Sequence, residues 1–301
     1  MAATPDSQAI RRALDRAAWF FRDRESRGGV LARRLLGQMR PDDRTLAEHL
    51  VRALRRKTRM DGSVEGSLVR TAWVAWELLD LGCSVDHAAV VRTVGYVLAA
   101  QDGPGHFGEG CSRERHGRRL CHHFLRGLFS PGARDIAIAP LAVPSGAVME
   151  AEEEARLAAS CLALRVVLRA GEDRRAVVRQ HVETLLQLPE LWNTWNESWS
   201  SDLVFLALGA LVLAPIEYRP RVEDYATHVL KQQDRDGGWQ GSHLFNALDA
   251  LWSAPPAVAR TAAQQAAPLL CRLQQESGAF SKDNDEEQAL IALRILQLAA
   301  S

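Results

Sequence analysis

The sequence predicts an all-α protein made of repeated helical hairpins. Apolar residues recur at positions i, i+3, i+4 and i+7 in most windows, which is the pattern of amphipathic helices. No alternating pattern long enough for a buried strand is present. The one extended candidate, 137–143, contains Pro140 and is followed by Pro144, which favours a loop. Turn-forming glycine pairs recur at a fixed spacing between the helical windows.

The helical windows follow one another along most of the chain. The window 68–81 is apolar on one face and is followed by Gly82, a residue typical of the position after a helix C-terminus. The window 156–170 ends in the same way at Gly171. Further helices are predicted at 8–24, 44–56, 201–213, 244–252, 257–275 and 285–300.

The turns repeat with a period that defines the architecture. Asp61-Gly62 and Asp102-Gly103 lie 41 residues apart, and so do Asp236-Gly237 and Ser277-Gly278. Two helices in each period of about 40–50 residues are typical of a solenoid or a closed helical ring. Shorter Ala- and Leu-rich helices that are apolar on nearly every side favour an inner ring wrapped by an outer one.

We expect one domain without a linker. Residues 1–48 supply an N-terminal helical extension that caps the ring, and residues 49–301 form the ring itself. An insertion is predicted at about 102–148. Its last part, 136–148, is either a lid over the ring or an ordinary connecting loop.

Composition excludes several classes of protein. The chain of 301 residues is 47% hydrophobic and 25% charged, as in globular proteins. Lys+Arg and Asp+Glu both total 37, so a nucleic-acid partner is disfavoured. No apolar run reaches the ~18 residues of a membrane span, and residues 1–7 show no signal peptide. The five cysteines are an odd number spread over a long chain, which disfavours disulfides and predicts a cytoplasmic protein.

The segment 221–239, which contains Gln232 and ends in Gly237-Gly-Trp239, resembles the QW repeat of squalene–hopene and oxidosqualene cyclases. Degenerate copies lie at 96–107 and 273–280. The chain is therefore similar to the terpene cyclase and protein prenyltransferase superfamily, and the resemblance implies an α/α toroid. Class II cyclases of this superfamily use two toroids with the reaction between them. The prenyltransferase β subunits use one toroid and a partner subunit.

The predicted starts of inner helices are acidic, and in the resembled fold these starts face one mouth of the ring. The class II acid motif is Asp-x-Asp-Asp, and residues 283–286 come close to it. The resemblance therefore makes Asp283, Asp285 and Glu286 candidate catalytic acids. Neighbouring carboxylates raise each other's pKa, as protonation of an alkene requires. The alternative is that these acids only cap helix N-termini.

Candidate substrate contacts are Trp195, Trp199 and His243. Aromatic faces stabilise cations, and the resembled cyclases need such a lining. Aromatic residues are only 6% of this chain, so the lining would be thin. The alternative is that the tryptophans pack between helical hairpins and that His243 belongs to the core or caps a helix.

A second cluster predicts a zinc site. The segment 106–123 holds four of the nine histidines and two of the five cysteines. Three or four of its side chains would bind the metal near the mouth of the ring. The candidate ligands are Cys111, His116, Cys121, His122 and His123. The alternative is a solvated loop in which these residue types occur by chance.

Two classes of function follow. The first is an enzyme, cyclase-like or prenyltransferase-like, that holds a hydrophobic, isoprenoid-like substrate in the ring. The second is a non-catalytic toroid, stapled by zinc, that binds a protein or peptide partner. A deep apolar cavity with a few convergent polar groups would favour the first class. A filled ring would favour the second.

Overall fold

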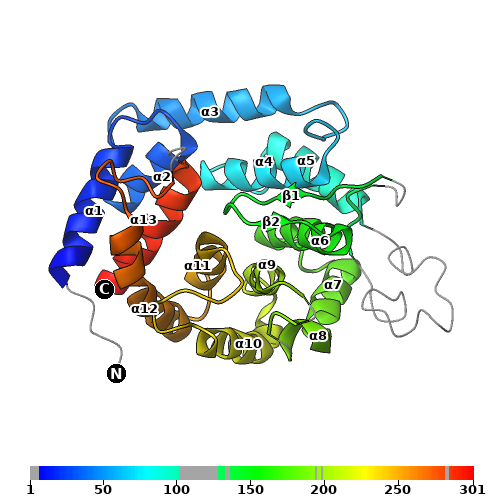
Figure 1. Ribbon diagram of the computed structural model, residues 1–301. Coiled ribbons are helices and arrows are strands. Elements are labelled where there is room, and N and C mark those ends of the chain that lie inside the picture. The colour runs from blue at the N-terminus through cyan, green and yellow to red at the C-terminus, as the bar shows by residue number, and fades with distance from the viewer. Residues whose placement is uncertain (1–6, 102–127, 133–135, 194, 198, 282–284) are drawn as a thin grey trace.

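The computed structural model describes residues 7–101, 128–132, 136–193, 195–197, 199–281 and 285–301. These residues form two concentric rings of helices, seen along the ring axis in Figure 1. Within the described ranges, strands are limited to one short hairpin. The prediction of an all-α toroid is confirmed.

The inner ring consists of helices that contact one another in chain order, and the last of them contacts the first. Its helices are α2 (Arg27–Leu35), α4 (Leu68–Asp80), α6 (Glu152–Arg169), α9 (Ser201–Leu211), α11 (Leu244–Trp252) and α13 (Glu286–Ala300). Helix α9 is buried on nearly every side, because one of its faces packs against the outer ring and the other faces the interior of the inner ring. Its continuous apolar sequence is explained by this position.

The outer ring wraps the inner one (Figure 1). Its helices are α1 (Ser7–Phe21), α3 (Asp43–Lys57), α5 (Ala88–Ala99), α7 (Ala176–Leu186), α10 (Arg219–Lys231) and α12 (Pro256–Leu273). The short helices α8 (Pro189–Trp192) and η3 (Ile216–Tyr218) lie in connections. No helix in the described part of the chain is long and apolar enough to cross a membrane.

The repeated turns connect an outer helix to the inner helix that follows it in the chain, and they also pack against the next outer helix. Gly62, Gly237 and Gly278 have φ angles of +89°, +93° and +87°, in the left-handed region that favours glycine. Each also lies against a backbone carbonyl of the following outer helix, so that a side chain would collide there. Gly278, which follows α12, contacts α1 in this way. The last outer helix is therefore linked to the first by the same kind of turn contact that links the other outer helices.

Two glutamines strengthen these turns. The Gln233 side-chain amide donates to the carbonyl oxygen of Ala262 on α12, at 3.2 Å. The Gln274 amide donates to the carbonyl of Ala13 on α1, at 3.0 Å. The indole of Trp239 donates to the carbonyl of Val229 on α10, also at 3.0 Å. Val229 lies in the last turn of α10, whereas Ala262 and Ala13 lie within their helices, so the two glutamines tie each turn to the body of the neighbouring outer helix.

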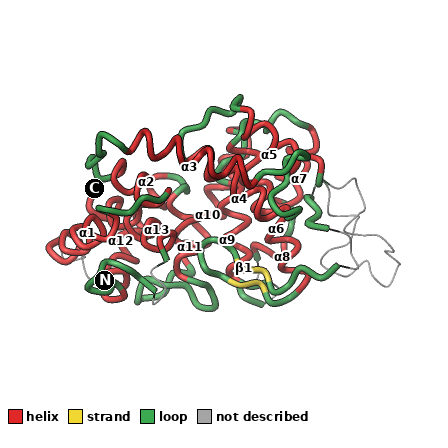
Figure 2. Tube along the Cα trace, turned by 90° about the horizontal axis from the view of Figure 1, so that it is seen from above, coloured by secondary structure: helices red, strands yellow, loops and turns green. Residues whose placement is uncertain are grey.

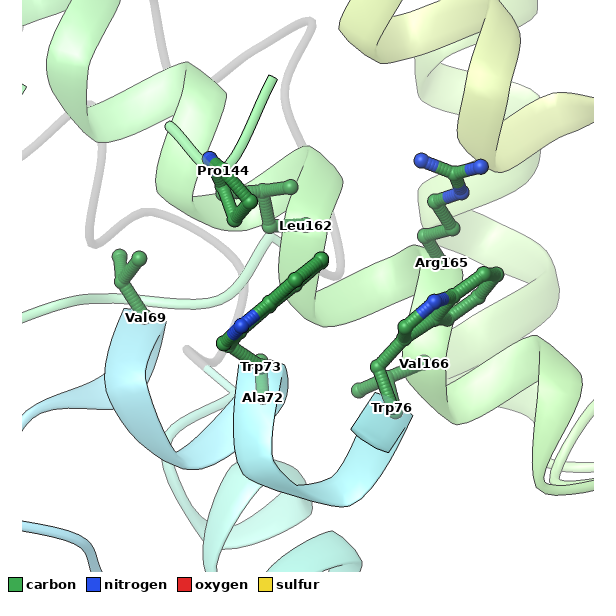
Figure 3. Close-up of a pocket in the computed structure, with 8 residues that line it drawn as sticks. All are labelled: Val69, Ala72, Trp73, Trp76, Pro144, Leu162, Arg165 and Val166. Carbon is green, nitrogen blue, oxygen red and sulfur yellow. The ribbon is translucent and has the colours of Figure 1, made fainter. Parts of the chain in front are cut away.

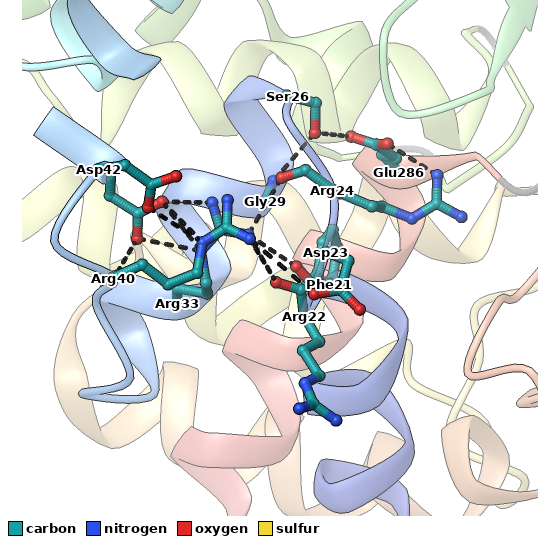
Figure 4. Close-up of polar contacts among 11 residues, drawn as sticks. Phe21, Arg22, Asp23, Arg24, Ser26, Gly29, Arg33, Arg40, Asp42 and Glu286 are labelled. Atoms are coloured by element: carbon teal, nitrogen blue, oxygen red, sulfur yellow. Dashed lines mark hydrogen bonds and ion pairs between the residues drawn. The ribbon is translucent and has the colours of Figure 1, made fainter. Parts of the chain in front are cut away.

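The N-terminal segment contributes directly to the ring. Helix α2 contacts α13 on one side and α4 on the other. The buried Arg33 of α2 holds it there, because its guanidinium pairs with Asp43 of α3 at 3.0 Å and donates to the carbonyl of Phe21 at 2.8 Å (Figure 4). The hydrogen bond from Arg33 keeps the pKa of Asp43 below its usual value despite burial. The domain boundary between residues 48 and 49 stays a prediction.

Candidate functional site in the ring interior

One face of α4 lines the interior of the inner ring. Trp73, Trp76, Glu77 and Asp80 follow the i, i+3, i+4, i+7 spacing, so they share one side of the helix. Their partners come from other inner helices, which places them inside the ring.

Arg27 of α2 connects three carboxylates. Its Nη1 atom lies 2.5 Å from Oδ2 of Asp80, its Nε atom lies 3.4 Å from Glu77, and it also pairs with Glu287 of α13. Arg169 of α6 contacts the other oxygen of Asp80 at 2.6 Å. Asp80 is 8% exposed, so its charge is compensated by two guanidinium groups in a largely dry environment.

A second ion pair crosses the ring. Arg165 of α6 pairs with Asp249 of α11. Helix α9 lies between these two helices and carries Gly209 at the crossing point. A Cβ atom at that glycine would stand 3.7 Å from Cζ of Arg165. Burial opposes ionisation of Asp249, but the charge and hydrogen bond of Arg165, together with the charges of Arg294 and Arg27, outweigh it and keep the pKa of Asp249 below its usual value.

The tryptophan faces inside the ring are covered by guanidinium groups. Arg165 and Arg169 lie over Trp76, with Cζ 4.5 and 3.9 Å from the ring centroid. Arg27 lies 5.0 Å from the ring centroid of Trp73 in the same manner. These contacts are cation–π interactions, and they show that the interior presents aromatic faces to positive charge.

Glu77 differs from the other acids described here. Burial raises the pKa of its carboxyl group above the ordinary value, and the nearby Asp80 adds to this effect. Arg27 and Lys57 act in the opposite direction. Glu77 is therefore a carboxyl group that holds its proton more strongly than usual within a site that stabilises cations.

A small pocket opens between α4 and α6 (Figure 3). Trp73 and Trp76 form one wall, Leu162 and Arg165 the other, and Pro144 covers it. Its volume is about 20 Å³, enough for about one water molecule. A larger pocket of about 400 Å³ lies between Leu211 and Pro256, in the connections that follow α9 and α11, and none of the charged residues of the ring interior lines it.

The short hairpin covers the end of the ring at which α6, α11 and α13 begin. Its strands are β1 (Leu141–Ala142) and β2 (Val148–Met149), where the sequence favoured a loop. The hydroxyl of Ser145 donates to the side-chain oxygen of Asn246 on α11 at 3.0 Å. Backbone amides before β1 bind the Glu152 carboxylate of α6 at 2.8 and 2.9 Å. Figure 2 shows β1 near one edge of the barrel.

The candidate acids lie at the start of α13. Asp283 lies outside the described residues. Asp285 is the N-cap, and its Oδ1 atom accepts a hydrogen bond from the backbone amide of Glu287 at 2.8 Å. Glu286 pairs with Arg24 at 2.9 Å and accepts a hydrogen bond from Ser26 (Figure 4). A catalytic role for these acids stays a prediction.

The candidate substrate contacts lie near the same end of the ring. Trp195 packs edge-on against Phe205 of α9, with centroids 5.9 Å apart, and Trp199 is 2% exposed within the main core. The backbone amide of His243 donates to Asp202 at 2.9 Å, and its ring lies against the hairpin tip. Their role in substrate binding is untested.

The predicted zinc ligands all lie within 102–127, outside the described residues. Elsewhere, in the part of the chain that the structure describes, no group of three or more His, Cys, Asp or Glu side chains is arranged to hold a metal ion.

Sequence reasoning missed most of the ring interior. Trp73 and Trp76 lie in a predicted helix at i, i+3 spacing, and this spacing was the available signal. The arginines carried no such signal, because they come from inner helices far apart in the sequence and the chain has many arginines.

Comparison with solved structures supports the fold over the whole chain. MstE, a type II terpene cyclase from Scytonema, was solved as a variant in complex with its substrate geranylgeranyl dihydroxybenzoate. It is 13% identical, with a TM-score of 0.59, and the match covers 98% of both chains. The apo form of MstE has the same identity and TM-score. A protein from Actinoplanes is 16% identical with a TM-score of 0.58, over 98% of this chain and 100% of the other.

At these identities the likeness shows the fold alone. No protein-family model matches the chain, and no curated protein matches it either.

Proposed function

We propose that this chain is a terpene cyclase-like protein that binds an isoprenoid substrate inside its inner ring. The observation that carries the proposal is the likeness to MstE over 98% of both chains, since that cyclase was solved with a geranylgeranyl substrate. The same coverage means that a type II terpene cyclase can consist of one toroid of this length.

The chemistry of the ring interior supports the proposal in two ways. Trp73 and Trp76 present aromatic faces to positive charge, which is the interaction that a carbocation requires. Glu77 offers a carboxyl group with a raised pKa on the same helix. Asp285 and Glu286 at the start of α13, together with Asp283, which precedes them in the sequence, are the alternative proton donors in this proposal.

Binding of a substrate in the pocket beside Trp76 requires a conformational change in this proposal. The pocket beside Trp76 holds about 20 Å³, whereas small-molecule sites typically have ~300–1,000 Å³. The hairpin 141–149 is the element that would move, because Pro144 closes the pocket and Ser145 fastens the tip to α11.

The test is incubation of the full chain with geranylgeranyl dihydroxybenzoate and with geranylgeranyl diphosphate. Cyclisation by protonation gives a product of unchanged mass with fewer double bonds, which liquid chromatography with mass and NMR detection resolves. We expect Glu77→Gln or Asp285→Asn to abolish conversion, depending on which group donates the proton, while the exposed Asp86→Asn has no effect. The proposal is rejected if neither compound is converted and neither compound shows saturable binding.

One observation favours a second function, a non-catalytic toroid that binds a protein or peptide. The ion pairs of Arg27, Asp80, Arg165 and Asp249 occupy part of the ring interior, and the described pocket beside Trp76 has a volume of only about 20 Å³. This function predicts that Glu77→Gln and Asp285→Asn leave every activity of the protein unchanged. It also predicts that a partner protein co-purifies in a fixed ratio.

A further inference from the structure

Arg294 of α13 is a buried guanidinium group without a hydrogen-bond acceptor among the described residues. The residue is 8% exposed, and its Nε atom is fully buried and unpaired. Its one close described contact is the face of Trp252, with Cζ 4.6 Å from the ring centroid. A guanidinium carries five N–H donors, and leaving even one of them buried and unpaired costs about 1–3 kcal/mol.

The surroundings of Arg294 place it inside the ring. The charges that act on it belong to Asp80 of α4, Asp249 of α11, Arg27 of α2 and Arg165 of α6. Only a position in the ring interior is near all four helices. Burial lowers the pKa of Arg294, and the two arginines add to this effect while the two acids oppose it.

The acids near Arg294 direct their hydrogen bonds to other arginines. Asp80 is held by Arg27 and Arg169, and Asp249 is held by Arg165. Among the described residues, Arg294 is therefore the one of the four guanidiniums (Arg27, Arg165, Arg169 and Arg294) that has no carboxylate in contact. Its Nε donor is left without any of these acceptors.

We propose that Arg294 binds an oxyanion of the ligand, a carboxylate or a phosphate group, inside the ring. A guanidinium fork matches either group with two parallel hydrogen bonds. This inference rests on the proposed function for the isoprenoid part of the ligand. It adds that the isoprenoid carries a carboxylate or a phosphate group. A dihydroxybenzoate head supplies a carboxylate, and a prenyl diphosphate supplies phosphate oxygens.

The experiment measures anion binding to the full chain with the two head groups alone. Inorganic diphosphate and dihydroxybenzoate are titrated by calorimetry, and the melting temperature is recorded with and without each anion. We expect saturable binding of one of them and a matching rise in melting temperature. The anion that binds identifies the head group.

Two variants and a control complete the test. Arg294→Met and Arg294→Gln should weaken anion binding at least about tenfold. Arg294→Met should also melt at a higher temperature than the wild type without anion, because it removes a buried unpaired charge. A purely structural arginine would give the opposite shift. The exposed Arg92→Gln on α5 should bind and melt like the wild type.

The outcomes separate this inference from the proposed function. No saturable binding of either anion to the wild type overturns the inference, and so does equal binding by the Arg294 variants. If the variants do not fold, the wild-type titration decides alone. Conversion of an uncharged geranylgeranylated phenol without any anion binding rejects the Arg294 site and leaves the proposed function standing. Anion binding that depends on Arg294, without conversion or saturable binding of any polyprenyl compound, rejects the proposed function alone.

Discussion

The guanidinium of Arg27 and the carboxylate of Asp80 join the first and second inner helices, with Nη1 and Oδ2 2.5 Å apart. The bond is buried on both sides, and Arg169 extends it to the third inner helix. Asp80 is therefore the point at which α2, α4 and α6 meet through charges rather than through apolar packing.

Asp80→Asn should lower the free energy of unfolding by about 3–5 kcal/mol. It leaves the buried guanidinium of Arg27 and the half-buried one of Arg169 with a neutral partner, and breaking a buried pair costs about this much. Urea unfolding followed by circular dichroism measures the change. Asp86→Asn, an exposed acid after α4, is the control and should change stability by less than about 0.5 kcal/mol. A loss below ~1 kcal/mol for Asp80→Asn would show that the ion pair is not required.

Glu77→Gln should stabilise the protein at pH 7 more than at pH 4. The pKa of Glu77 is raised in the folded state by burial and by Asp80, against Arg27 and Lys57. The folded state therefore binds its proton more strongly. The stability from this group is present below pH 4.5, the ordinary pKa, and is lost as pH rises through the raised folded pKa.

Glutamine cannot ionise, so the variant avoids this loss. The measurement is the difference in unfolding free energy between Glu77→Gln and wild type at both pH values. An equal difference at the two pH values would contradict the raised pKa.

His181→Gln should flatten the acid side of the stability profile. Burial lowers the pKa of His181 from 6.5 to about 3, so the folded state keeps it neutral beside Ser160. The stability from this group is present above pH 6.5 and is lost as pH falls towards pH 3. The wild type should lose about 1.4 kcal/mol per pH unit more than the variant in this range.

Urea unfolding at several pH values gives both slopes for the His181 test. His49→Gln, at an exposed position on α3, serves as the control. Parallel wild-type and His181→Gln profiles would mean that His181 is not buried neutral.

Gly237→Ala should destabilise the protein more than Gly171→Ala. Both glycines have positive φ, +93° and +80°, so both variants pay the left-handed strain of roughly 1–2 kcal/mol. A Cβ atom at Gly237 would also collide with the carbonyl oxygen of Gln265 on α12, whereas Gly171 has open space around it. The added cost should be about 1–3 kcal/mol. Similar melting temperatures for the two variants would show that the turn is not pressed against α12.

The zinc prediction concerns residues that the structure does not describe. Protein purified without chelator should carry about one zinc ion per chain by elemental analysis. The combined change Cys111→Ser and Cys121→Ser should remove it, because thiolates are preferred zinc ligands. Binding should weaken on acidification, since the ligands must be deprotonated. Full metal content in the double variant, or none in the wild type after zinc supplementation, would show that the cluster binds no metal.

The sequence by itself determined several of the helices and three of the turns. The predicted window 68–81 became α4 (Leu68–Asp80), and 244–252 became α11 over the same residues. Gly62, Gly237 and Gly278 mark the observed turns, because a positive φ is a local demand that only a few residue types meet. Periodicity is local in the same sense, since residues three and four apart share a helix face whatever the fold.

Only the tertiary structure decided what fills the ring. Arg165 reaches Asp249 because Gly209 on the intervening helix leaves room, and Arg294 lies near both, with no carboxylate of the described residues in contact. These residues come from four separate repeats. Their meeting depends on how far each helix is rotated about its axis and on how the ring closes, and the short-range pattern of a helix specifies neither.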